Sequence, residues 1–137
     1  MKDKYYTPSI EEFYVGFGYE YFEEAENEWI DKCEFRVRGK GIYFPTDGSD
    51  EVFRILLSNN HIRVKYLDRD DIESLGFEHT EGSDKFAWFK SGKWVMQFNN
   101  GHCHIHTGNE MLRHFSGYIK NKSELKKILK MIGYEGN

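Results

Sequence analysis

The sequence predicts an α+β fold: a twisted antiparallel β-sheet of six to eight strands, with a C-terminal amphipathic helix packed on one face. Two observations predict it. Aromatic and β-branched residues alternate with polar ones in several segments between residues 13 and 120, which is typical of strands with one packed face. After residue 121 the period changes, and Leu125, Ile128, Leu129 and Ile132 recur at helical spacing. A chain of 137 residues suits one domain, so we expect a single domain over 1–137.

The first half predicts strands at residues 13–22, 29–37 and 42–44, followed by a helix. Ser49 is a suitable N-cap for this helix, and Asn59 and Asn60 end it. Residues 62–66 alternate as a further strand. Asp68 is predicted to cap a short helix that runs to residue 75, where Gly76 stops it.

Residues 85–120 are predicted to form an antiparallel meander. We expect two-residue turns at Ser91-Gly92, at Asn100-Gly101 and at Gly108-Asn109. The second is the strongest signal, because asparagine and glycine both tolerate the positive φ of a type I′ turn. Asn121 is expected to cap the last helix, over residues 122–132, and Gly133 to end it.

Composition and charge exclude some classes of function. The net charge is −4, which counts against a broad nucleic-acid surface and makes a nucleic-acid partner unlikely. No apolar run approaches the length of a membrane span, and the first residues lack the apolar segment of a signal peptide. The two cysteines, Cys33 and Cys103, form no C-x-x-C motif. We therefore expect a cytoplasmic protein with no membrane association.

Histidines at alternate positions of one predicted strand are the main chemical lead. His102, His104 and His106 would share a face of the sheet. With two-residue turns on both sides, Gln97 and Arg113 would lie opposite His104, and His114 would lie opposite Cys103. We take the three histidines, Gln97 and Arg113 as candidate binding residues.

A divalent metal such as zinc is the alternative for this strand. The H-x-H pattern presents imidazoles to one ion, and Glu110 is the nearest carboxylate, so the candidate ligands are His102, His104, His106 and Glu110. An arginine beside the central histidine disfavours a cation there. The preferred interpretation is a partly exposed polar face with no cofactor.

Other charged clusters have simpler explanations. The acids between 68 and 73 fit a helix cap and first turn, since a calcium loop would need a glycine and a distal glutamate. Lys126, Lys127 and Lys130 fall off the apolar stripe of the last helix and are expected to be its solvated face. Binding of a phosphate-rich partner by these lysines is a third hypothesis.

Several segments resemble a group of small proteins of tailed phages and prophages for which no activity is established. The resemblance lies in YTPSIEEF (6–13), GFGYE (16–20), IRVKYLD (62–68), DIESLGF (71–77) and IKNKSELKKIL (119–129). It implies a small accessory protein of the kind that serves host takeover or anti-defence. It assigns no functional residue.

The leading functional hypothesis is a non-enzymatic binding module for a host protein or a small ligand. Aromatic residues make up 17% of the chain, and they supply contact area at low entropic cost. A homodimer through exposed sheet edges is an alternative that the sequence leaves open.

Overall fold

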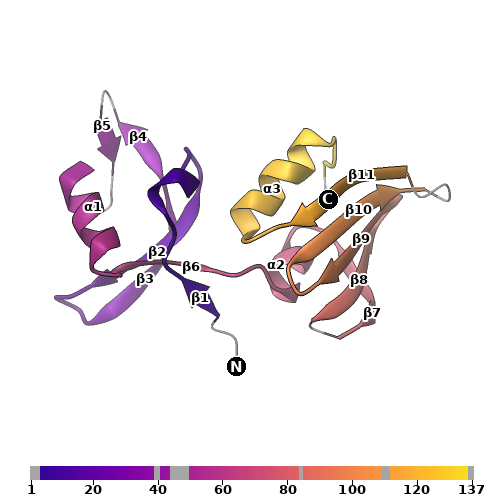
Figure 1. Cartoon of the computed structure of the whole chain (residues 1–137), viewed down its shortest axis with the longest axis horizontal. Coiled ribbons are helices and arrows are strands. Elements are labelled where there is room, and N and C mark those ends of the chain that lie inside the picture. The colour runs from indigo at the N-terminus through magenta and orange to yellow at the C-terminus, as the bar shows by residue number, and fades with distance from the viewer. Residues whose placement is uncertain (1–3, 39–40, 44–49, 84, 109–111, 136–137) are drawn as a thin grey trace. The chain divides into compact units, whose positions relative to one another are not determined.

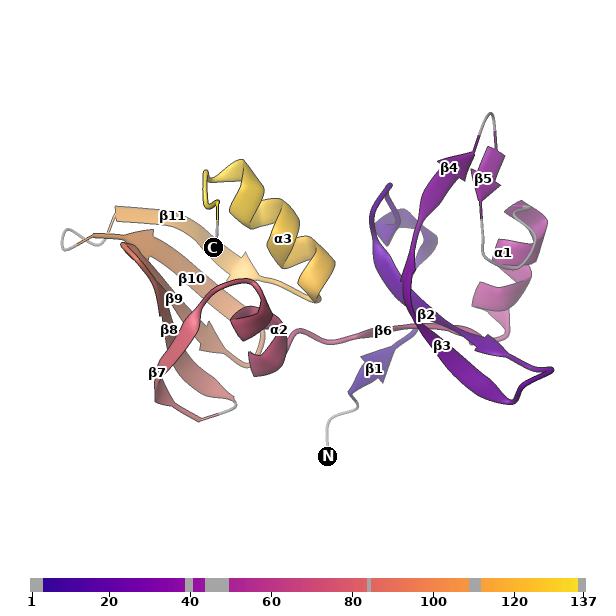
Figure 2. The same cartoon turned by 180° about the vertical axis from the view of Figure 1, so that it is seen from behind.

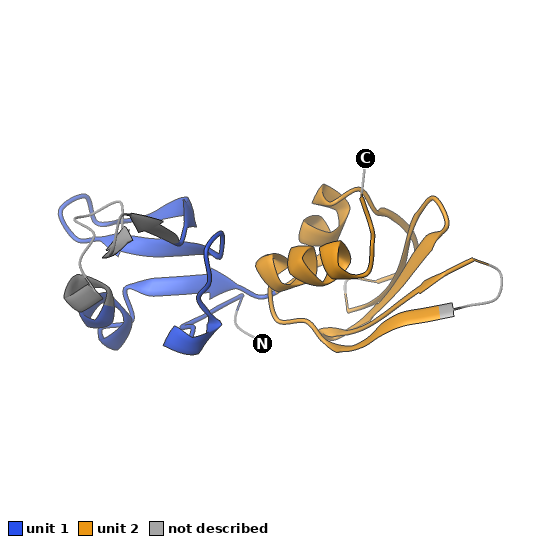
Figure 3. Cartoon of the chain, turned by 90° about the horizontal axis from the view of Figure 1, so that it is seen from above, with its two compact units in different colours: residues 1–66 blue, residues 67–137 orange. Residues whose placement is uncertain are grey.

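The structure is a computed structural model that describes residues 4–38, 41–43, 50–83, 85–108 and 112–135. It contains antiparallel sheets of four and five strands, a two-stranded ribbon and a C-terminal helix, which confirms the α+β prediction. The strands are divided between separate sheets rather than joined in one. We expected a single domain, and the chain separates into two compact units, residues 1–66 and 67–137, coloured differently in Figure 3.

The N-terminal unit contains the four-stranded sheet, in the order β1 (Tyr5–Tyr6), β6 (Ile62–Lys65), β2 (Gly18–Glu23) and β3 (Glu28–Glu34). A 3₁₀ turn, η1 (Ile10–Glu12), precedes β2, and a ribbon of β4 (Arg36–Arg38) and β5 (Gly41–Tyr43) leads to helix α1 (Asp50–Ser58) (Figure 1). The buried core of this unit is aromatic and aliphatic: Phe17, Tyr19, Tyr21, Cys33, Phe35, Ile62 and Val64.

Two predicted strands of this unit are shorter than expected. The strand predicted over 13–22 begins only at Gly18, because the backbone N–H of Phe17 donates to the carbonyl of Tyr14 over 2.9 Å in a local turn, in which Gly16 has a φ of +98°. The strand predicted over 29–37 breaks at Phe35. The backbone N–H of Phe35 still donates to the carbonyl of Phe17 over 2.8 Å, and the chain then continues in β4, which pairs with β5.

The C-terminal unit is a meander of five strands in sequential order. They are β7 (Glu78–Gly82), β8 (Phe86–Ser91), β9 (Trp94–Asn99), β10 (His102–Thr107) and β11 (Leu112–Tyr118). Helix α2 (Arg69–Ser74) precedes the sheet and helix α3 (Lys122–Met131) follows it. The meander predicted over 85–120 is therefore confirmed, and β7 is an additional strand.

One face of this sheet carries the core of the unit. Ala87, Phe89, Met96, Cys103 and Ile105 are each fully buried. Ile72 of α2 and Leu125 and Leu129 of α3 belong to the same apolar cluster. Figures 1 and 2 show α3 lying along the sheet, as the helical spacing predicted. The predicted packing of the C-terminal helix on one face is thus confirmed.

The predicted caps of α2 and α3 are present, and Ser49, the predicted cap of α1, lies outside the described residues. The Asp68 carboxylate accepts the backbone N–H of Asp71 over 3.0 Å, and the Asn121 side chain accepts that of Glu124 over 2.8 Å. Each bond satisfies an N–H group that the helix itself leaves free. The acids around residue 70 therefore serve the cap, as expected.

The turns of the meander decide which residues face each other. Asn100 and Gly101 have φ values of +49° and +93°, which fits the predicted type I′ turn. The turn predicted at Ser91-Gly92 lies one residue later, because Ser91 pairs with Trp94. The turn predicted at Gly108-Asn109 is wrong: the ladder closes with Thr107 opposite Leu112, and residues 109–111 of the connection lie outside the described residues.

Candidate functional site

The face of the five-stranded sheet opposite the core carries all the candidate residues that the structure describes. We call it the outer face. It is formed by the residues of β8 to β11 that alternate with the buried ones, and neither described helix of this unit packs on it. The residues are Phe86, Trp88 and Lys90 on β8, Val95, Gln97 and Asn99 on β9, His102, His104 and His106 on β10, and Arg113, Ser116 and Tyr118 on β11.

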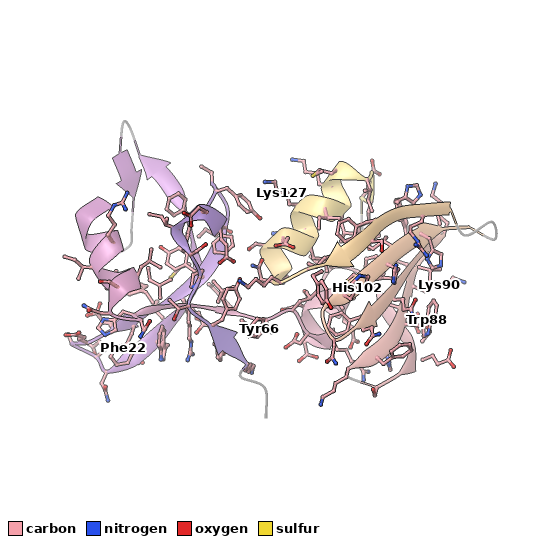
Figure 4. All side chains as sticks on the ribbon, viewed as in Figure 1. Phe22, Tyr66, Trp88, Lys90, His102 and Lys127 are labelled. Atoms are coloured by element: carbon pink, nitrogen blue, oxygen red, sulfur yellow. The ribbon has the colours of Figure 1, made fainter. Side chains whose placement is uncertain are left out.

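The strand registers arrange these residues in three rows that cross the sheet. The first row is Phe86, Asn99, His102 and Tyr118; the second is Trp88, Gln97, His104 and Ser116; the third is Lys90, Val95, His106 and Arg113. Figure 4 shows Trp88 and Lys90 on β8 and His102 on β10 of the same sheet. Aromatic rings thus gather in the first two rows, and fixed positive charges lie in the third.

His102 and His104 form the centre of an aromatic cluster. Their ring centroids lie 4.8 Å apart, and the ring of Tyr118 stands almost perpendicular to that of His102 at 4.9 Å. The Nδ1 atom of His104 is 3.0 Å from the hydroxyl oxygen of Ser116. Both histidines are half-buried, so part of each ring is open to a ligand.

His106 has a different environment from the other two histidines. It is only 7% exposed, its ring lies edge-on to Trp88 at 6.4 Å, and Arg113 lies opposite it on β11. Burial and the Arg113 charge lower the pKa of His106. Burial, Arg113 and the two neighbouring histidines lower the pKa of His104. Both shifts favour the neutral form, so both imidazoles are mostly neutral at pH 7.

Of the two residues predicted to lie opposite His104, one is correct and one is wrong. Gln97 lies opposite it, as the Asn100-Gly101 turn predicted. Arg113 does not, because Ser116 takes that position and Arg113 pairs with His106. Two shifts cause this: the β10–β11 ladder closes with Thr107 opposite Leu112, two residues away from the predicted register, and a bulge between Ile105 and His106, where His114 is the extra residue of β11, adds one more. The expected pairing of His114 with Cys103 is wrong for the same reason, and Gly117 lies there instead.

The alternative metal site is only partly described. Its candidate ligand Glu110 lies outside the described residues. Within the ranges that the structure describes, no three His, Cys, Asp or Glu side chains are grouped closely enough to hold an ion. His102 and His104 form an imidazole pair on this face, with ring centroids 4.8 Å apart.

Four residues of the outer face did not stand out in the sequence: Phe86, Trp88, Lys90 and Tyr118. The signal that would have found them is the same alternation that placed the histidines, because β8 carries buried Ala87 and Phe89 at the intervening positions. Phe86 is 45% exposed and Tyr118 is 74% exposed, which is unusual for such large apolar rings. The outer face is therefore more aromatic than the histidine pattern alone suggested.

The lysines of α3 point away from the core, as expected for a solvated helix face. Lys126, Lys127 and Lys130 are all exposed, and Figure 4 shows Lys127 on this helix. Lys126 and Lys130 border an open hollow of about 370 Å³ that Tyr134 and Leu75 also line. Because these lysines lie on the side of α3 away from the sheet, they form a surface separate from the outer face.

No protein-family model, curated protein or solved structure matches this sequence. Among the helices of the described part of the chain, none has both the length and the apolar composition required to cross a bilayer.

Proposed function

We propose that this chain is a non-enzymatic binding module that acts in the cytoplasm, and that the outer face of the C-terminal sheet holds its partner, a host protein or a small ligand. This is the role expected of a phage-type accessory protein. One observation carries the proposal: the sheet buries its apolar residues on one side and presents the large exposed rings of Phe86 and Tyr118 on the other. Exposed apolar area of this kind, mixed with polar groups, is typical of interaction sites.

The composition of the outer face supports binding. Tyr118 and Phe86 offer contact area, while Gln97, Asn99 and Ser116 offer hydrogen-bonding groups among them. Aromatic residues at the centre of a contact surface contribute a large share of binding energy. A flat face with distributed polar groups suits recognition of a partner better than it suits chemistry in an enclosed site.

Affinity capture from a lysate of the host cells tests this proposal. The bait is the tagged full-length protein, with Tyr118→Ala as the variant and Met131→Ala as the matched control. Both side chains are 74% exposed and apolar, but Met131 lies on α3 rather than on the outer face. We expect some captured molecules to be bound by the wild type and by Met131→Ala but not by Tyr118→Ala. An identical set from all three baits would contradict the proposal.

A metal site on His102 and His104 is the second candidate. The observation that favours it is the 4.8 Å separation of two imidazole rings on one strand face. The Arg113 guanidinium nearby opposes a dication electrostatically. Zinc titration by calorimetry tests it: stoichiometric binding that His102→Ala and His104→Ala each abolish would favour the metal over a macromolecular or organic ligand.

A further inference from the structure

We infer that the outer face binds single-stranded nucleic acid by stacking bases on its exposed rings. This inference rests on the proposed function only in that the outer face is a binding surface, and it names a nucleic acid in place of the protein or small ligand proposed above. Three features of the outer face carry it: the ring row, the polar groups between the rings, and the fixed charges at one end.

The ring row supplies a stacking platform. Phe86 and Tyr118 stand at its two ends with His102 beside Tyr118, and the row crosses four neighbouring strands. Strands are spaced about 4.8 Å apart, so the row is roughly 14 Å long. That length suits two or three successive bases, which is the number that an open antiparallel sheet stacks on its aromatic residues. Trp88 in the second row extends the platform.

The polar residues between the rings match the edges of unpaired bases. Asn99 lies between Phe86 and His102 in the first row, and Gln97 lies between Trp88 and His104 in the second. An amide side chain can both donate and accept, which is what the Watson–Crick edge of a splayed base requires. A duplex hides these edges, so the match is to a single strand.

Charge separates a nucleic acid from other partners. Lys90 and Arg113 are exposed in the third row and can contact phosphates. Among the described residues of the neighbouring strand β7, at one edge of the face, Glu78 pairs with Lys90 and Glu81 pairs with Trp88. An acidic peptide would meet the two cations but would leave the planar rings without planar partners. A nucleotide chain engages both.

The division of charge between the units reduces the objection that the net charge of −4 raises. Residues 67–137 contain ten Lys and Arg and ten Asp and Glu, so this unit is formally neutral. Residues 1–66 contain nine of the basic and thirteen of the acidic residues, so the whole net charge of −4 belongs to the N-terminal unit. The overall charge therefore does not describe the outer face.

Fluorescence anisotropy of the full chain with labelled single strands of about eight nucleotides tests the inference, using both DNA and RNA of mixed sequence. We expect binding at low salt, with Tyr118→Ala weakening it roughly tenfold and Met131→Ala leaving it unchanged. Two phosphate contacts predict a slope of log K against log salt of about −1.4. Lys90→Ala should make that slope less steep by about 0.7, whereas Lys130→Ala on α3 should not change it.

Each outcome of this experiment either supports or overturns the inference. No binding of any single strand at low salt overturns the inference, as does binding that Lys130→Ala weakens and Tyr118→Ala does not, because the site would then lie on α3. If free mononucleotides compete as well as the single strand at the same nucleotide concentration, the base-and-phosphate chemistry is supported and the ligand is a small nucleotide. If single strands fail but Tyr118→Ala still loses a captured protein, the inference is wrong and the proposed function stands. If both experiments fail, both are wrong.

Discussion

Arg113 lies directly across from His106 on the neighbouring strand, in the third row of the outer face. A guanidinium beside an imidazole disfavours protonation of that imidazole, and burial of His106 acts in the same direction. The same arginine contributes to the lowered pKa of His104. The outer face therefore keeps two of its histidines uncharged at neutral pH.

We predict that the protein loses stability as the pH falls below about 6.5. The folded-state pKa values of His104 and His106 lie below the ordinary value of 6.5, so the unfolded chain takes up protons first. The stability contributed by the neutral rings is complete above the unfolded pKa and is lost as the pH falls toward the folded values. Melting temperatures at pH 7.5 and 5.5 measure this loss.

Arg113→Gln provides the matched test of the cause. Removing the guanidinium should raise both histidine pKa values and reduce the difference between the two melting temperatures, whereas Lys90→Gln should reduce it less. Chemical shifts of the histidine ring protons give the pKa values directly. A pH dependence that Arg113→Gln leaves unchanged would rule out this electrostatic origin.

Arg63 in the N-terminal unit supports a second prediction. Its guanidinium lies 3.7 Å from the ring centre of Tyr5 and 4.1 Å from that of Trp29, and it also pairs with Glu20. We expect Arg63→Ala to lower the free energy of unfolding by about 1–3 kcal/mol, because cation–π and ionic contacts disappear together. Arg63→Lys should cost less than alanine but more than zero, since an ammonium group keeps the charge and loses the planar stacking.

Urea unfolding measures these changes, and Arg54→Ala is the control. Arg54 is exposed on α1 of the same unit, so its loss should change the free energy of unfolding by less than about 0.5 kcal/mol. Equal effects of Arg54→Ala and Arg63→Ala would mean that the two rings contribute no stability through Arg63.

The sequence correctly predicts those features of the fold whose geometry one or two residues determine. Asp68 and Asn121 cap their helices because a short polar side chain at that position satisfies a free N–H group. Asn100-Gly101 determines the pairing of Gln97 with His104, since a two-residue turn leaves no freedom of register. The histidine face followed directly from that turn and from strand alternation.

The remaining features depend on interactions that no short segment encodes. The pairing of Arg113 with His106 depends on where the β10–β11 ladder closes, at Thr107 and Leu112, and a bulge at His114 then moves Ser116 opposite His104; a bulge has no sequence requirement strong enough to predict it. The separation of the strands into two sheets depends on which strands pair across long distances, as β1 does with β6. The aromatic share of the outer face, by contrast, follows from the alternation in β8, where Phe86 and Trp88 flank Ala87.

Gly82 at the end of β7 gives a third prediction. Its φ is +95°, and a Cβ atom there would lie 2.2 Å from the backbone carbonyl oxygen of Phe86. Gly82→Ala should lower the free energy of unfolding by at least about 2 kcal/mol, because the β7–β8 connection must move. Gly92→Ala is the control: its φ is +59° but nothing lies within 4 Å of a Cβ, so only the backbone cost of about 1 kcal/mol applies.

The two variants are compared by urea unfolding followed through tryptophan fluorescence. If Gly92→Ala lowered the free energy of unfolding as much as Gly82→Ala, backbone conformation alone would account for the loss. The close approach to Phe86 would then contribute nothing to it.

The two thiols should be inert in the folded protein. Burial is the main cause that raises the pKa of Cys103 to about 12, and the charge of Glu124 adds to it. Burial, followed by the charges of Asp31 and Glu20, raises the pKa of Cys33 to about 11. At pH 8 the thiolate fraction of a thiol with pKa 11 is about a hundredfold smaller than that of one with pKa 9, and with pKa 12 about a thousandfold smaller. Because the thiolate is the reacting species, a disulfide reagent such as dithionitrobenzoate should label native Cys103 more slowly than native Cys33. In urea both should react at one common rate. Rapid labelling of Cys103 in the native state would instead show that β10 opens to solvent on the timescale of the reaction. The histidine face of β10 would then be less rigid than expected for a strand that lies on a buried core.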